Sequence, residues 1–263
     1  ISITPILYAQ QGLIVSKAMV VSAREEASQI GVDIMKKGGN AFDAMIATEL
    51  ALAVAYPYAG NIAGGGFMVY SLNNGETGAL DYREKAPLLA SKNMYLDKNK
   101  EVIPNLSVNG ALAVGVPGTI AGIFAVHQKF GKLSMQEIMQ PVIALAKKGI
   151  IVTAKQLKQI QTNQQDIIAV SGEQTLYAKP YKIGDTIKYP ALANTLERIL
   201  KNGKDEFYKG ETAQKLVAFL QQKGGIISLD DLSKYEAVWR KPITFKYKDL
   251  KIISMSPPSS GRI

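Results

Sequence analysis

Two runs of strand-forming residues, joined by the turn Asn73-Asn74-Gly75, restrict this chain to folds that contain an antiparallel sheet. The runs are Phe67 to Leu72 and Thr77 to Glu84. An Asn-Gly turn between such runs predicts a β-hairpin. A second hairpin is expected between Ile243–Tyr247 and Leu250–Met255. Because the strands do not alternate strictly with helices, a doubly wound parallel sheet is disfavoured and an α+β class is expected.

Helix signals surround the first hairpin. Ser22-Ala23-Arg24-Glu25 has the pattern of a capping box, which predicts a helix from there to Lys37 that stops at Gly38-Gly39. Asn40 is expected to cap a second helix, from Ala41 to about Ala55. This second helix is apolar nearly all round, so it should lie in the interior.

More helices are expected in the second half of the chain. Pro117-Gly118-Thr119 should lead into a helix that ends near Lys129, and Ser134 starts another capping box. Pro141 is expected to break or restart the helix that ends at Gly149. Further helices are predicted at 154–165, at 190–202, at 211–223 and after Ser228. No repeat or clear linker interrupts the pattern, so residues 1–263 are expected to form a single domain.

Composition excludes several classes of site. Apolar residues make up 47% and charged residues 20%, which predicts a packed globular core. Cysteine is absent, which excludes disulfides, thiolate nucleophiles and cysteine zinc sites. The single histidine, His127, argues against a histidine-rich metal site and against a Ser-His-Asp triad. We interpret it as a surface or C-cap residue near a helix end.

The formal charge of +9 raises the possibility of nucleic-acid binding. The lysines are nevertheless dispersed and often stand beside acids, as in Lys204-Asp205-Glu206, so a solvated basic surface is the preferred interpretation. The longest apolar stretch, Ala44 to Tyr58, contains Glu49 and reaches Pro57, which indicates a buried helix rather than a membrane span. Any signal peptide is expected to have been removed or never to have existed.

Arg83, near the end of the second strand, is the candidate binding residue. Strand alternation places Asp81 and Arg83 on one face and Leu80 and Tyr82 on the other. A guanidinium presents a planar fork of donors that matches a carboxylate, which suggests a small anionic substrate. The alternative is an ion pair with Asp81 or another surface acid. Asp81 and Glu84 lie on opposite faces, so a cooperating carboxylate pair is not predicted.

Two further motifs remain open or are weak. No Gly-Lys-Ser/Thr follows Gly64-Gly65-Gly66, and the run precedes a strand, so a phosphate loop is a poor interpretation. It is either a tight turn into the hairpin or a loop where backbone approaches a ligand. Ser259-Ser260 has no base nearby in the sequence and no Gly-x-Ser-x-Gly pattern. These residues alone identify no nucleophile.

Five blocks, taken in order, resemble the large subunit of bacterial γ-glutamyltranspeptidases. They are Lys37–Ala44 (KGGNAFDA), Pro57–Phe67 (PYAGNIAGGGF), Asp81–Pro87 (DYREKAP), Gly115–Thr119 (GVPGT) and Pro257–Gly261 (PPSSG). The resemblance implies an N-terminal-nucleophile hydrolase fold, an αββα sandwich completed by a small subunit. It also implies a precursor, an inactive zymogen, that cuts itself into a heterodimer. Arg83 matches the family's arginine for the α-carboxylate of the γ-glutamyl group.

The resemblance further implies where the chemistry resides. The nucleophile would be the N-terminal threonine of the small subunit, so no catalytic residue, no metal ligand and no cofactor is expected in this chain, and the chain alone should be inert. The substrate would be glutathione or another γ-glutamyl compound, with transfer to water or to an amine. The expected location is the periplasm or the exterior, with no nucleic-acid partner and no membrane span.

Three departures from the family pattern and two alternatives stand beside this interpretation. Ala63 and Arg262 replace usual glycines, and the chain stops at Ile263, before the segment that usually precedes the cleavage site. The same fold and arginine would also serve an enzyme that processes poly-γ-glutamate. A non-catalytic module that kept the carboxylate site is the second alternative.

Overall fold

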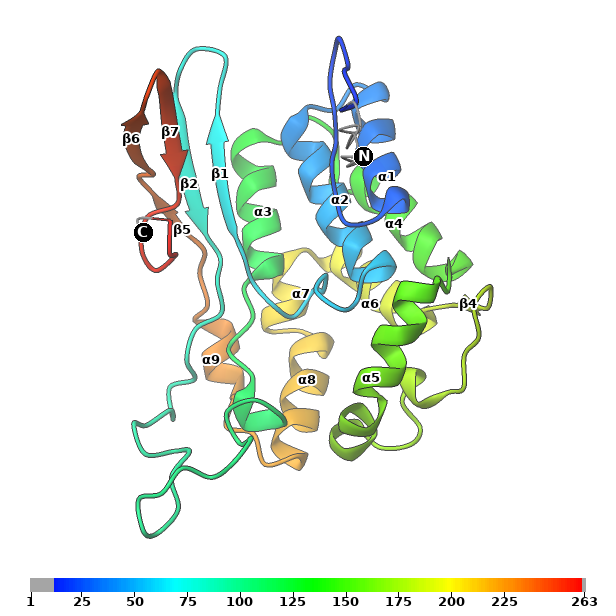
Figure 1. Cartoon of the computed structure of the whole chain (residues 1–263), viewed down its shortest axis with the longest axis vertical. Coiled ribbons are helices and arrows are strands. Elements are labelled where there is room, and N and C mark those ends of the chain that lie inside the picture. Colours follow the sequence, from blue (N-terminus) through cyan, green and yellow to red (C-terminus); the bar gives the residue numbers. More distant parts are fainter. Residues whose placement is uncertain (1–11, 262–263) are drawn as a thin grey trace, which may run out of the picture.

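A computed structural model describes residues 12–261 of the chain. Figure 1 shows most of the strands along one side of the molecule, helices beside and below them, and one short strand at the opposite side. The helices are α1 (Glu25–Lys36), α2 (Ala41–Ala55), α3 (Thr119–Phe130), α4 (Met135–Lys148), α5 (Ala154–Ser171), α6 (Pro190–Asn202), α7 (Lys204–Tyr208), α8 (Glu211–Gln222) and α9 (Leu229–Ser233). Single 3-10 turns lie at Ala111–Ala113 and Leu176–Ala178. The departure at Arg262 lies outside the described residues.

All the sheets of the described region are antiparallel. The three-stranded sheet has the order β1 (Phe67–Ser71), β2 (Thr77–Asp81), β5 (Val238–Arg240). The two smaller sheets pair β3 (Ile150–Ile151) with β4 (Thr186–Ile187), and β6 (Ile243–Tyr247) with β7 (Leu250–Ser254). Both predicted hairpins are confirmed. The strand β5 and the short pair β3–β4 were not predicted, because they are too short to show a period.

The caps of three helices are confirmed. The Asn40 side chain accepts from the backbone N–H groups of Phe42 and Asp43, and Asp43 bonds back to the Asn40 N–H, which completes a capping box. Ser134 and Ser228 form capping boxes at α4 and α9. These bonds satisfy backbone donors that have no partner inside the helix.

Two expectations about helices are wrong. Arg24, not Ser22, is the N-cap of α1, because the Ser22 hydroxyl bonds instead to the Arg24 carbonyl and to Ser28. Pro141 does not break its helix, since α4 continues from Met135 to Lys148 around it. Ile138, Met139, Val142 and Ile143 of α4 are buried, and this packing holds the helix together across the proline.

The core lies where the helices meet the sheet. As predicted, α2 is interior: Ile46, Leu50 and Val54 are almost completely buried. The sheet contributes Leu80 and Tyr82 to the same cluster, and α3 contributes Ile120. One side of β2 is therefore fixed against the helices, which sets the direction of the residues that follow it.

Candidate functional site

Arg83 lies just beyond the end of β2 with an exposed side chain. The strand pairing extends past Asp81, because Tyr82 N donates to the Gly66 carbonyl at 3.0 Å and Gly66 N donates to the Tyr82 carbonyl at 3.3 Å. Tyr82 is buried beneath Arg83. The predicted alternation, with Tyr82 inward and Arg83 outward, is therefore confirmed.

Hydrogen bonds hold the Arg83 backbone on both sides. Its N–H donates to Asp81 Oδ1 at 3.1 Å, and its carbonyl accepts from the Tyr235 hydroxyl at 2.7 Å. Tyr235 stacks on Tyr208, with ring centroids 5.8 Å apart and planes 9° from parallel. Burial raises the pKa of Tyr235, and the nearby Asp81 and Glu84 carboxylates raise it further, so the hydroxyl keeps its proton and remains a donor.

The Arg83 guanidinium faces the turn that holds the last of the five blocks. Its Nη1 donates to the Pro258 carbonyl at 3.4 Å, and its Cζ lies 5.9 Å from the centroid of the Phe67 ring. Within residues 12–261 it forms no ion pair with a carboxylate. Most of its donors are therefore available to an anion from outside this part of the chain.

The ion pair between Arg83 and Asp81, considered from the sequence, does not form. Asp81 Oδ2 instead accepts a hydrogen bond from Arg240 Nε at 2.8 Å and forms an ion-pair contact with Arg240 Nη2 at 2.7 Å. Arg240 reaches Asp81 because β5 pairs with β2 in a register that sets Ala79 opposite Arg240. Nothing local in the sequence indicates this partner, which lies 159 positions away.

The glycine run packs tightly under the same site. The Gly64 carbonyl accepts from Gly118 N at 2.7 Å and from Thr119 N at 3.1 Å, where α3 begins. A Cβ on Gly65 would lie 2.6 Å from the Tyr82 carbonyl oxygen, closer than backbone atoms tolerate. Of the two interpretations left open, close packing into the hairpin is supported. It also brings the blocks around Gly64, Arg83 and Gly118 together.

Glu49 lies next to the strand that carries Arg83, although the sequence marked it only as an interruption of an apolar helix. Its carboxylate accepts from the Tyr82 hydroxyl at 3.2 Å, on the inner side of the strand that carries Arg83. Burial raises the Glu49 pKa to about 7. Glu49 is half-buried, and desolvation of its carboxylate is the main cause of the raised pKa.

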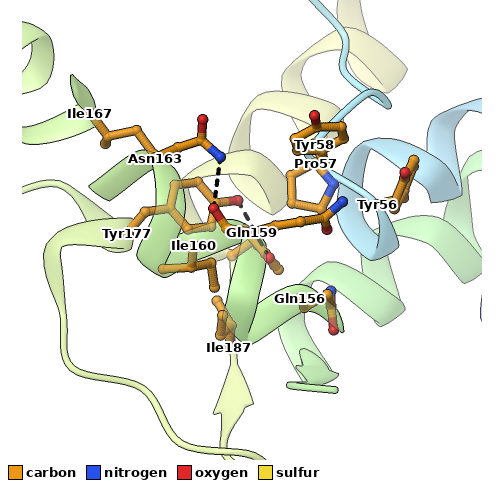
Figure 2. A pocket seen from close by; sticks show the side chains of 11 residues that line it. Tyr56, Pro57, Tyr58, Gln156, Gln159, Ile160, Asn163, Ile167, Tyr177 and Ile187 are labelled. Carbon is orange, nitrogen blue, oxygen red and sulfur yellow. Dashed lines mark hydrogen bonds between the residues drawn. The ribbon is translucent and has the colours of Figure 1, made fainter. Parts of the chain in front are cut away.

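A separate cavity of about 280 Å³ lies between α5 and the segment after α2. Figure 2 shows Tyr56, Pro57 and Tyr58 on one side of it and the glutamines of α5 on the other. The lining is uncharged and consists of Tyr56, Pro57, Tyr58, Gln156, Gln159, Ile160, Asn163, Ile167, Tyr177, Ile187 and Tyr189. It holds no cation for a carboxylate, and Arg83 is not among its residues, so it is not the predicted anion site.

Other candidate groups are placed as follows. His127 lies half-buried in the last turn of α3, with Nε2 2.8 Å from the Leu133 carbonyl, which fits the structural role expected for it. Ser259 and Ser260 follow Pro258 in the turn beside Arg83. In residues 12–261, no three acidic or histidine side chains gather as metal ligands would. No helix of that region combines the length and apolar character that a membrane crossing requires.

Comparisons with known proteins agree on one family. A family model described as gamma-glutamyltranspeptidase matches residues 27–263. The chain is 45% identical over 247 residues to the glutathione hydrolase proenzyme of Pseudomonas aeruginosa, covering 93% of this chain and 43% of that protein. It is 41% identical over 251 residues to the proenzyme of the same name from Escherichia coli, covering 94% and 43%. The chain thus spans about two fifths of the length of these relatives.

Solved structures agree as well. The crystal structure of Helicobacter pylori gamma-glutamyltranspeptidase superposes with a TM-score of 0.92 at 42% identity, covering 95% of this chain and 73% of that one. The Bacillus anthracis transpeptidase CapD superposes with a TM-score of 0.78 at 28% identity, covering 94% and 78%.

Proposed function

The chain belongs to the γ-glutamyltranspeptidase family, and from that premise we propose that it is most of the large subunit of a two-chain enzyme that cleaves γ-glutamyl amides. The predicted fold class, the α+β sandwich of the N-terminal-nucleophile hydrolases, is confirmed by the likeness to solved members of the family. The small subunit that completes the sandwich is part of the proposal. We also propose that residues 1–263 form one domain. A single continuous cluster of buried hydrophobic residues supports this.

The observation that carries the proposal is the Arg83 guanidinium. It is exposed, its backbone is held on both sides, and no carboxylate of the described region occupies its fork. Such a fork suits the α-carboxylate of a γ-glutamyl group, because two parallel N–H···O bonds fix both position and orientation. Arg83 would therefore anchor the substrate, and the described chain would supply binding rather than bond-breaking groups.

The reaction belongs to the partner chain. The N-terminal threonine of the small subunit would attack the γ-carbonyl carbon, while its own α-amine takes the hydroxyl proton. The C–N bond breaks, the amine leaves with a proton, and a γ-glutamyl ester remains on threonine. Water or an acceptor amine then releases the γ-glutamyl group. The relatives are named glutathione hydrolase proenzymes, and we carry glutathione over as the donor. The proposed location, periplasmic or secreted, follows the family.

The test uses the full-length precursor. Mass spectrometry should find two chains, the smaller beginning with threonine, and the matured protein should release glutamate from glutathione. Poly-γ-glutamate assayed in parallel separates the two enzyme alternatives. If no second chain with an N-terminal threonine forms, the non-catalytic module is favoured. Turnover of neither substrate by the matured heterodimer contradicts both enzyme functions.

Arg83→Lys tests the anchor itself. Lysine keeps the charge but loses the bidentate contact, so KM for the γ-glutamyl donor should rise about ten- to a hundredfold, the equivalent of losing one charged hydrogen bond. Maturation should be unaffected, because the Arg83 side chain is exposed. The matched control is Arg198→Lys, which changes an arginine that pairs with Glu206 on other helices. An unchanged KM in matured Arg83→Lys contradicts the role of Arg83.

A further inference from the structure

Arg240 occupies the carboxylate of Asp81, which stands two residues before Arg83. We propose that Arg240 is a positioning residue that keeps the Arg83 fork available to substrate by holding Asp81 away from it. This inference rests on the proposed function, because it concerns the same anchor. It adds a second arginine that never touches substrate but determines how well the first one binds it.

Asp81 is placed to compete for Arg83. The two residues lie two positions apart on one strand face, and Asp81 Oδ1 already accepts from the Arg83 backbone N–H at 3.1 Å. The Asp81 side chain is largely buried, with 10% of its surface exposed. A buried carboxylate without a cation is costly, so it recruits one that is within reach.

Arg240 meets that need from the neighbouring strand. Asp81 lies opposite Val238 in the β2–β5 ladder, and Arg240 stands two residues further along β5. This is a diagonal cross-strand position, which a long side chain can span. Its Nε donates a hydrogen bond to Asp81 Oδ2 at 2.8 Å, and its Nη2 makes an ion-pair contact with the same oxygen at 2.7 Å. Arg240 thereby occupies Oδ2 of Asp81, the carboxylate oxygen that does not accept from the Arg83 backbone N–H.

Lys85, the next cation along the chain after Arg83, is engaged elsewhere. Lys85 Nζ donates to the Glu236 carbonyl at 2.9 Å and lies 4.7 Å from the centroid of the Tyr235 ring. Without Arg240, Arg83 is therefore the cation that Asp81 can draw in from its own strand face. The Arg83 fork would then turn toward Asp81, and the substrate carboxylate would have to displace an internal ion pair.

The experiment measures KM and kcat for glutathione with the matured two-chain enzyme. Arg240→Gln should raise KM about tenfold or more, the equivalent of one charge-assisted hydrogen bond, while kcat changes far less. Adding Asp81→Asn to Arg240→Gln should lower KM again, because the competing carboxylate is gone while an amide oxygen can still accept from the Arg83 N–H. Asp81→Asn alone should raise KM less than Arg240→Gln alone.

A purely structural role for the Asp81–Arg240 ion pair predicts a different ranking of the variants by KM. It predicts that Asp81→Asn damages the enzyme as much as Arg240→Gln, and that the double variant is at least as impaired; that order overturns the inference. Arg198→Gln is the matched control, since it breaks another half-buried Arg–carboxylate pair and should leave KM unchanged. If Arg240→Gln does not mature, Arg240→Lys should raise KM by less, and Asp81→Asn should reverse that rise too.

The two proposals fail separately. If Arg83→Lys raises KM but Arg240→Gln does not, Arg83 remains the anchor and the role of Arg240 is refuted. If Arg83→Lys leaves KM unchanged, the anchor itself is refuted, whatever Arg240 does.

Discussion

At the scale of single residues, Glu49 is a carboxyl group whose chemistry is changed by its surroundings. It lies on the apolar helix α2 with its carboxylate beside the Tyr82 hydroxyl. Burial raises its pKa from 4.5 to about 7 in the folded chain. Between those two pH values the unfolded chain has released the proton and the folded chain still holds it. The contribution of Glu49 to the free energy of unfolding therefore falls as pH rises, and this contribution is lost above about pH 7.

Glu49→Gln should remove this dependence. Glutamine is neutral at every pH and can still accept from the Tyr82 hydroxyl. Relative to the wild type, the free energy of unfolding of the variant should therefore improve by up to about 3 kcal/mol between about pH 4 and pH 8. Urea unfolding followed by circular dichroism at several pH values measures it. Parallel pH profiles for wild type and variant would contradict the raised pKa.

Glu26 provides a control, because its pKa is shifted in the opposite direction to that of Glu49. Hydrogen bonds from the Arg24 side chain lower the Glu26 pKa, so its contribution is present above the ordinary carboxyl range and is lost as pH falls through the lowered value. Glu26→Gln should therefore cost more stability at neutral than at acidic pH. Opposite trends in the two variants would separate their local causes from a general effect of net charge.

At the scale of elements, Asp43 fastens the start of α2 to the loop between α3 and α4. This completely buried carboxylate accepts from Asn40 N at 2.9 Å, from Lys132 N at 3.0 Å and from Leu133 N at 3.3 Å. It thus serves as a helix cap and as a tertiary contact. Its removal leaves donors from two segments without a partner inside the protein.

Asp43→Ala should lower the free energy of unfolding by about 3 kcal/mol, since it unpairs several buried backbone donors at once. Ser134→Ala, which removes an exposed cap of α4, should cost only about 1 kcal/mol. Urea denaturation of both variants gives the comparison. Equal losses would mean that the contact with Lys132 and Leu133 contributes nothing beyond capping.

Local signals predicted the elements well and their partners poorly. Asn74-Gly75 and the capping residues Asn40 and Ser134 act over a few positions, so the sequence shows them directly. Ser22 has the same local pattern as a true cap, but Ser28 and the Arg24 carbonyl compete for its hydroxyl. A local pattern cannot register that competition.

The candidate site divides in the same way. The outward direction of Arg83 follows from strand alternation, and its proposed role from the family resemblance. The Asp81–Arg240 pair depends on how β5 adds to the sheet, and the Tyr235 bond to the Arg83 carbonyl spans 152 positions. Such contacts arise from tertiary packing, so only the folded structure reveals them.

At the scale of the whole molecule, the positive charge is dispersed. Exposed lysines pair with acids four residues earlier in the chain, as Lys209 does with Asp205, Lys215 with Glu211 and Lys234 with Asp230. Exposed pairs of this kind add little stability, but each places an acid beside a lysine. The charge of +9 is therefore consistent with a solvated surface, and the sequence interpretation that sets nucleic acid aside stays a prediction.

The hairpin β6–β7 exposes apolar side chains that would be more stable under a cover. A two-stranded sheet alone is marginal in water, and Phe245, Tyr247 and Leu250 on this one are exposed. Figure 1 shows the hairpin at the opposite side of the molecule from α1 and α2. This chain spans 43% of the length of the Pseudomonas aeruginosa relative. The proposed remainder of the precursor is therefore long enough to cover the hairpin.

Phe245→Ser should therefore weaken assembly of the proposed two-chain enzyme. The substitution removes an aromatic side chain from the surface that we expect the remainder of the precursor to bury, at a cost of about 1.5–3 kcal/mol of hydrophobic stabilisation. The yield of matured heterodimer in size-exclusion chromatography should fall. Phe219→Ser is the matched control, because Phe219 is similarly exposed but lies on α8. Equal losses from both variants would show that β6–β7 is not the covered surface and that lost solubility or folding explains the effect.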